Sequence, residues 1–202
     1  MPRRTGTERL EARRARLERH AAETNPDAVL NAAARFLELR SRSVEEVRKH
    51  LTAAAFPPAL VEGAVDRLLQ LGWLDDRAFA TAWVESRDRA RPRGQVALRR
   101  ELTLKGIDRE IVDAVLADRN EAAADGEGDS GGYGRPGVGV GSADEMAAER
   151  LLRKSRGALL RIDDPRVRRQ RVYALLARNG FDPDVCREVS TRFAAPDAGL
   201  DD

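Results

Sequence analysis

Leu98–Leu116 reads LRRELTLKGIDREIVDAVL: an apolar helical face, a glycine, a large apolar residue and then a second apolar helix. The same pattern recurs in VRKHLTAAAFPPALVEGAV (Val47–Val65) and VYALLARNGFDPDVCREVS (Val172–Ser190). When the copies are aligned, successive columns hold Leu51, Leu102 and Leu176; Ala55, Gly106 and Gly180; Phe56, Ile107 and Phe181; and Leu60, Ile111 and Val185. Repeats of this length indicate tandem helical units, each too small to bury its own apolar face.

We therefore predict an all-α protein of three tandem three-helix repeats, stacked into an elongated, curved array. Helix-start signals support this reading: an N-cap residue followed by proline, or a serine followed three residues later by glutamate. They occur at Asn25-Pro26, Ser43 with Glu46, Asp164-Pro165 and Asp182-Pro183. No long segment alternates with a period of two, so no sheet is expected. The predicted boundaries are 25–73 for repeat 1, 74–120 for repeat 2 and 143–195 for repeat 3.

The remaining segments differ from the repeats in composition. Residues 1–24 form a basic N-terminal extension, expected to be disordered or a frayed helix, because it has few apolar residues. Residues 121–142 are a Gly-rich flexible insertion, and 196–202 are an acidic tail. Cys186 is the only cysteine and aligns with valines of the other repeats, which predicts a buried residue in a reducing compartment. With no signal peptide or membrane span, we expect a cytoplasmic monomer with no membrane partner.

Arginine dominates the basic residues. The chain has a net charge of only +2, but three of its 36 basic residues are lysines and the other 33 are arginines. Arginine suits bidentate contacts to phosphate or carboxylate groups. An alternative reading is that the abundance of Arg and Ala reflects GC-rich coding and carries no functional information.

The basic residues cluster at the same place in each repeat, the junction between the first and second helices. If the repeats stack, these junctions form a stripe suited to a phosphate backbone or an acidic protein groove. The alternative is a solvated face whose charge is neutralised by Glu45, Glu46 and Glu101. The candidate binding residues are Arg40, Arg42, Arg48, Lys49, Arg87, Arg89, Arg91, Arg93, Arg99, Arg100, Lys105, Arg153, Lys154, Arg156, Arg166, Arg168, Arg169 and Arg171.

Signals for catalysis, cofactors and metals are weak. The string GYGRPG at 132–137 fits a dinucleotide-binding pattern, but it lacks the strand and helix that this site requires. Asp75-Asp76 and Asp163-Asp164 precede predicted helices and are read as caps rather than metal ligands. Neither His20 nor His50 is accompanied by a serine or cysteine motif. We predict no enzyme activity and no cofactor or metal, with a small-molecule enzyme kept as a minor alternative.

The middle repeat resembles the RecX regulatory proteins of bacterial recombination. The matching residues are Gly72-Trp73-Leu74-Asp75-Asp76, Phe79-Ala80, Trp83-Val84, Arg87, Gly94, Leu98, Leu102 and Lys105-Gly106-Ile107. The outer repeats resemble the family more weakly, through Arg40–Ser43, Glu45, Val47 and Leu51, and through Arg178–Phe181. The resemblance covers about Ala28 to Phe193 apart from the insertion. The insertion and the basic extension depart from the compact family pattern, so the resemblance assigns them no role.

The resemblance implies a non-enzymatic protein that binds the RecA recombinase and its filament on single-stranded DNA. It implies inhibition of ATP hydrolysis and strand exchange, and thereby modulation of repair and of the SOS response. Trp73, Phe79 and Trp83 are expected in the core rather than at the contact surface. The alternative is a stand-alone DNA-binding protein of helix-turn-helix type, which would bind single- or double-stranded DNA without a recombinase.

Overall fold

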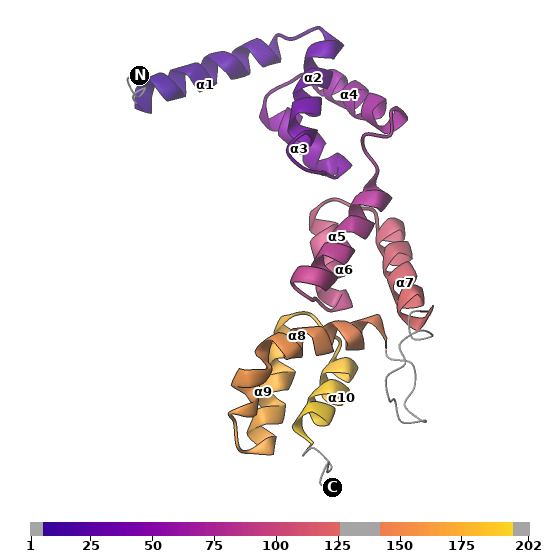
Figure 1. Ribbon diagram of the computed structural model, residues 1–202. Helices are drawn as coiled ribbons and strands as arrows, with labels where there is room; N and C mark the ends of the chain where they lie inside the picture. The colour runs from indigo at the N-terminus through magenta and orange to yellow at the C-terminus, as the bar shows by residue number, and fades with distance from the viewer. Residues whose placement is uncertain (1–5, 126–141, 196–202) are drawn as a thin grey trace. The chain divides into compact units, whose positions relative to one another are not determined.

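The computed structural model describes residues 6–125 and 142–195, and within these ranges it contains ten α-helices and no strand. The predicted all-α class is confirmed. Figure 1 shows the helices along the chain. Their bounds are α1 Gly6–Ala21, α2 Pro26–Leu37, α3 Val44–Ala53, α4 Pro58–Gln70, α5 Asp76–Ala90, α6 Gln95–Leu104, α7 Arg109–Asp125, α8 Ala143–Leu160, α9 Pro165–Arg178 and α10 Pro183–Ala194.

The chain divides into two compact units. One comprises the residues up to Phe79 together with Lys105–Ile107, and the other comprises Ala80–Leu104 together with the residues from Asp108 onward. The division therefore passes through the second of the predicted repeats. Most of the predicted insertion and the whole acidic tail, residues 126–141 and 196–202, lie outside the described residues.

In the first unit, α2, α3 and α4 enclose one apolar core. Val29, Val47, Leu51 and Leu68 are fully buried there. The helix starts follow the sequence signals, since Asn25 accepts from the backbone N–H of Asp27 and the serine before α3 forms a complete capping box. Helix α1 buries none of its residues. It contacts the unit through His20, whose ring stacks on Phe56 and whose Nδ1 lies 2.8 Å from the carbonyl oxygen of Ala54.

In the second unit, α8, α9 and α10 enclose a core of the same design. Leu152, Val172, Leu176, Phe181 and Cys186 are buried in it. The prediction that the single cysteine is a buried small hydrophobe is confirmed. Figure 1 shows this group in orange to yellow, with α9 beside α10.

The aligned small residues all adopt a left-handed backbone. The φ angle is 67° at Ala55 and 77° at both Gly106 and Gly180. Around Gly180 the bonds are those of a Schellman motif: the N–H of Phe181 donates to Leu176 O at 3.3 Å, and that of Gly180 to Ala177 O at 3.0 Å. The motif turns the chain so that the next residue, a large apolar one in each copy, enters the core. The repeated column is therefore a backbone requirement.

The left-handed turn also allows a close approach by another backbone segment. A Cβ atom at Gly180 would lie 2.3 Å from Cβ of Ala97 at the start of α6. A Cβ atom at Gly94 would lie 2.2 Å from Gly180 O, and the N–H of Gly94 donates to Asn179 O at 3.1 Å. In the first unit, Ser43 Oγ donates to Lys105 O at 2.6 Å, beside Gly106. The turn after the second helix thus contacts the N-terminus of an earlier helix in both units.

Of the three aromatic residues expected in the core, one lies at the surface. Phe79 is buried and Trp83 is half-buried, with its indole N–H donating to Glu101 at 2.9 Å. The prediction for Trp73 is wrong, because its side chain is 59% exposed. Trp73 directly follows Gly72, which has a φ of 69°, and the buried residue after this turn is Leu74.

Replacing Ala55 by glycine should stabilise the protein. A left-handed conformation costs an L-residue about 1–2 kcal/mol, and the extra freedom of glycine in the unfolded chain offsets only about 0.4–1 kcal/mol of that. We expect Ala55→Gly to raise Tm by about 2 °C in thermal unfolding. The matched control is Ala117→Gly in the exposed middle of α7, which should lower Tm. A lower Tm for Ala55→Gly would contradict the strained turn.

Replacing Gly180 by alanine should destabilise the protein by about 2 kcal/mol or more, because the added Cβ combines a left-handed backbone with a clash. Denaturant unfolding gives the free energy directly. Gly157→Ala is the control, since a Cβ at that helical glycine meets no atom within 4 Å. It should be neutral or stabilising, and equal effects of the two substitutions would rule out the close contact at Gly180.

Candidate functional site

The first basic cluster is held by its own carboxylates. Arg48 donates to Glu62 at 2.9 Å and to Glu45 at 2.9 Å, and these two partners raise its pKa above the usual value. The hydrogen bond from Arg48 in turn lowers the pKa of Glu45. The other members are Arg40, 3.4 Å from Glu46; Lys49, 3.3 Å from Glu45; and Arg42, which stacks over Phe36 at 4.0 Å.

Lys105 also has an internal partner. Its Nζ donates to Glu46 Oε1 at 2.7 Å, and the Glu46 carboxylate further accepts from the N–H of Ser43 at 3.4 Å. Burial acts to raise the pKa of Glu46, but Lys105, together with the N–H of Ser43 and the charge of Arg40, outweighs it, so the pKa lies below the ordinary value. Glu46 and Lys105 therefore join α3 to the turn at 105–107.

The second cluster is partly neutralised. Arg87 donates to Glu101 at 2.7 Å and lies over the Trp83 ring at 4.3 Å. Arg93 donates to the side chain of Asn179 at 2.6 Å. Arg99 is paired with Asp113, and Arg89 is 3.9 Å from Glu85. Among the described residues, Arg91 and Arg100 have no ion-pair partner for their side chains.

Arg119 is the most deeply buried basic residue among these ion pairs, and it is not one of the candidates predicted from the sequence. The Arg119 side chain is 7% exposed and donates to Asp88 at 2.9 Å and to Asp144 at 2.6 Å. Burial lowers its pKa, but the two carboxylates more than compensate and raise it. Asp144 also accepts from the N–H of Gln95 at 2.9 Å, so this network joins α5, α6, α7 and α8. Its members are far apart in sequence, which is why no local motif indicated it.

The third cluster keeps most of its charge. Lys154 donates to Ala90 O at 2.6 Å, and Arg168 donates to Ile162 O at 3.0 Å. The other five basic residues of this cluster have no carboxylate partner within the part of the chain that the structure describes. They are Arg153, Arg156, Arg166, Arg169 and Arg171. Of the three candidate clusters, the one on α8 and α9 therefore keeps the most unneutralised positive charge.

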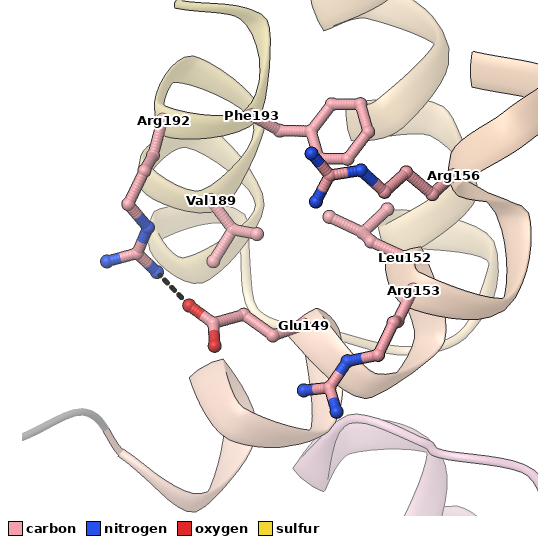
Figure 2. A pocket seen from close by; sticks show the side chains of 7 residues that line it. All are labelled: Glu149, Leu152, Arg153, Arg156, Val189, Arg192 and Phe193. Carbon is pink, nitrogen blue, oxygen red and sulfur yellow. Dashed lines mark ion pairs between the residues drawn. The ribbon is translucent and has the colours of Figure 1, made fainter. Parts of the chain in front are cut away.

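One groove runs between α8 and α10 and encloses about 290 Å³ (Figure 2). Leu152, Val189 and Phe193 give it an apolar lining, and Arg153 and Arg156 come from α8. The lining also includes Glu149, which forms an ion pair with Arg192 of α10 at 3.0 Å. Apolar side chains among arginines are typical of a surface that binds another protein.

A second groove, of about 490 Å³, lies between α9 and α10. Arg166 and Arg169 line it from α9, and Arg187 lines it from α10. Gln170, Tyr173, Ser190 and Thr191 complete the lining, which includes no carboxylate. Of these seven residues, only the two arginines of α9 are among the candidates predicted from the sequence. The others could not be found from charge clustering, because α10 carries no arginine run.

No described group of residues has the arrangement of a metal site. Over residues 6–125 and 142–195 there is no cluster of three or more His, Cys, Asp or Glu that could hold a metal ion. Asp164 and Asp75 cap helices, as expected. The GYGRPG string lies outside the described residues. Among the helices described, none is long and apolar enough to cross a membrane.

Comparison with known families matches all three repeats. The first three-helix domain of RecX matches residues 30–68, the second matches 75–116 and the third matches 143–189. These are the three regions in which the sequence pattern recurs.

Similar proteins and solved structures agree with this assignment. The regulatory protein RecX of Chlorobium phaeobacteroides is 32% identical over 168 residues, covering 83% of this chain and 95% of the relative. That of Mycolicibacterium smegmatis is 30% identical, covering 82% and 79%. A crystal structure of RecX from Lactobacillus salivarius has a TM-score of 0.62 at 17% identity, covering 83% of this chain and 96% of that chain. A second RecX crystal structure also has a TM-score of 0.62, at 20% identity, covering 81% and 70%.

The contact between Glu46 and Lys105 predicts a pH-dependent effect. A lowered pKa means that the ionised carboxylate adds stability above its unfolded pKa of about 4.3, and that this stability is lost as the pH falls through the lower folded value. Glu46→Gln should therefore lower Tm at pH 7, and the difference from wild type should shrink towards pH 3. Glu38→Gln, at an exposed position, is the control and should leave Tm unchanged at both pH values. A difference for Glu46→Gln that stays constant with pH would exclude the charge as its cause.

Proposed function

Since this chain belongs to the RecX family of regulatory proteins, we propose that it binds the RecA recombinase as its filament on single-stranded DNA. As a member of this family it is a regulatory protein and not an enzyme. Binding inhibits ATP hydrolysis and strand exchange by the recombinase. The protein thereby modulates recombinational repair and the SOS response in the cytoplasm.

The groove between α8 and α10 carries the proposal for the recombinase contact. Its apolar residues give a partner side chain a place to be buried, while Arg153 and Arg156 have no carboxylate partner among the described residues. A partner that brings acidic side chains would supply the missing charges. Most basic residues of the first two clusters already have such partners, so the third repeat is the favoured contact region.

Inhibition requires a preference between states of the recombinase. A ligand shifts an equilibrium only by the difference between its affinities for the two states. The regulator must therefore bind the filament state with low ATP turnover more tightly than the active state. Charged residues at the rim of an interface mainly accelerate association, so the two α8 arginines are expected to act on the association rate.

The second candidate function, a DNA-binding protein that acts alone, is favoured by the unneutralised arginines of repeat 3. The two functions differ in what they require. Binding to DNA alone should weaken steeply with salt and needs no recombinase. The regulatory function needs the recombinase, and inhibition should be seen at less than one molecule of regulator per protomer.

The test is the single-stranded-DNA-stimulated ATPase of the cognate recombinase, titrated with this protein. Wild type should inhibit well below equimolar concentration. Arg153→Glu with Arg156→Glu should raise the concentration needed for half-inhibition by about tenfold or more, which corresponds to about 1.4 kcal/mol. Both side chains are exposed, so the folded state should be retained.

The control is Arg67→Glu with Arg109→Glu, which reverses two exposed charges outside the clusters. It should inhibit like wild type. Equal losses in both double variants would assign the effect to net charge rather than to the α8–α10 groove. Absence of inhibition by wild type, with DNA binding intact, would replace the proposed function by the second candidate.

A further inference from the structure

The groove between α9 and α10 differs in charge from the other described cavities. The α8–α10 groove includes Glu149, and two further cavities, lined in part by α7 and α8, include Asp88 and Asp144. The α9–α10 groove has three arginines and no carboxylate in its lining. Of these four described cavities, it is the one whose lining has arginines and no carboxylate.

The arginines are placed to act together. Arg166 and Arg169 are three positions apart on α9, so they are neighbours on one face of the helix. Neither guanidinium has an acidic partner within residues 6–125 and 142–195. Arg187 contributes from α10 and is paired with Asp184, which does not line the groove. A guanidinium presents a planar fork of donors that matches the oxygens of a phosphate.

The uncharged residues of the groove fix its shape and leave the arginines as its charged donors. Tyr173 is partly buried and packs against the core of repeat 3. The hydroxyl of Ser190 donates to Arg187 O at 3.1 Å, and that of Thr191 donates to the same oxygen at 2.8 Å. Both hydroxyl hydrogens are therefore engaged by the backbone.

We propose that the α9–α10 groove binds the phosphodiester backbone of a single-stranded nucleic acid. A concave, positively charged channel suits one strand, whereas duplex DNA is usually read by an element that protrudes into a groove. An acidic peptide is less suited, because this lining lacks the aliphatic and phenylalanine side chains of the α8–α10 groove that anchor a protein partner. The inference rests on the proposed function in one respect: the RecA filament of that proposal contains a single DNA strand, which is the kind of ligand assigned to this groove.

The test measures binding by the full chain without recombinase. Fluorescence anisotropy of a labelled oligothymidylate gives the affinity as a function of salt. The oligonucleotide has about 16 nucleotides, the upper end of the range that one OB domain binds on a single strand. Each phosphate contact to a single strand contributes about 0.7 to the slope of log K against log salt. Arg166→Gln with Arg169→Gln should lower the affinity at least tenfold and reduce the slope by about 1.4.

The matched control is Arg153→Gln with Arg156→Gln. It removes the same charge at the same spacing from the same repeat, but from the other groove. It should leave the salt slope for the oligonucleotide unchanged while weakening inhibition of the recombinase ATPase. All four substitutions replace exposed side chains without ion-pair partners among the described residues, so thermal unfolding should match wild type.

Three results would overturn the assignment: equal losses of affinity in the two double variants, no oligonucleotide binding by wild type, or displacement by a polyglutamate peptide but not by unlabelled oligothymidylate. The last would identify an acidic-peptide groove. The proposed function fails separately. If wild type binds the oligonucleotide but leaves the recombinase ATPase unchanged, the groove assignment stands and the regulatory function does not.

Discussion

The left-handed turn after the second helix of each repeat is the constraint on which the rest of the structure depends. It ends the helix and directs a large apolar residue into the core, and in the second and third repeats it also brings the backbone against the start of an earlier helix. At Gly94 and Gly180 the approach leaves no room for a Cβ atom. At Ala55 the same turn is made by a residue that is poorly suited to it.

Charge in this protein serves two purposes that composition alone does not separate. Arg48, Lys105 and Arg119 hold helices together through specific carboxylates. Arg153 and Arg166, in contrast, line grooves and have no carboxylate partners among the described residues. Internal pairing in the first two clusters leaves the third as the candidate cluster with the most unpaired arginines for an anionic partner.

Features that depend on neighbouring residues could be predicted from the sequence. The repeats, the capping box at Ser43 and the buried Cys186 are of this kind, because helix periodicity and capping are local. Pairing is not local: Arg119 reaches Asp88, 31 positions away. Which arginines remain unpaired therefore required the structure. The position of Trp73 could not be predicted, because a large aromatic residue next to a turn can point either way, and here Leu74 occupies the core.

Two helix starts receive a hydrogen-bond acceptor from the repeat that follows them. Asp76, at the start of α5, accepts from the N–H of Val44 in α3, and Asp144 in α8 accepts from that of Gln95 in α6. The corresponding helix of the third repeat, α9, is capped by Asp164, which directly precedes it. The second helix of each of the first two repeats thus has an acceptor from the repeat that follows, although α3 also has its own capping box at Ser43, and α9 is capped within its own repeat. The fit of a helix start in one repeat therefore depends on an aspartate that belongs to the next, so that consecutive repeats must be matched to each other in pairs.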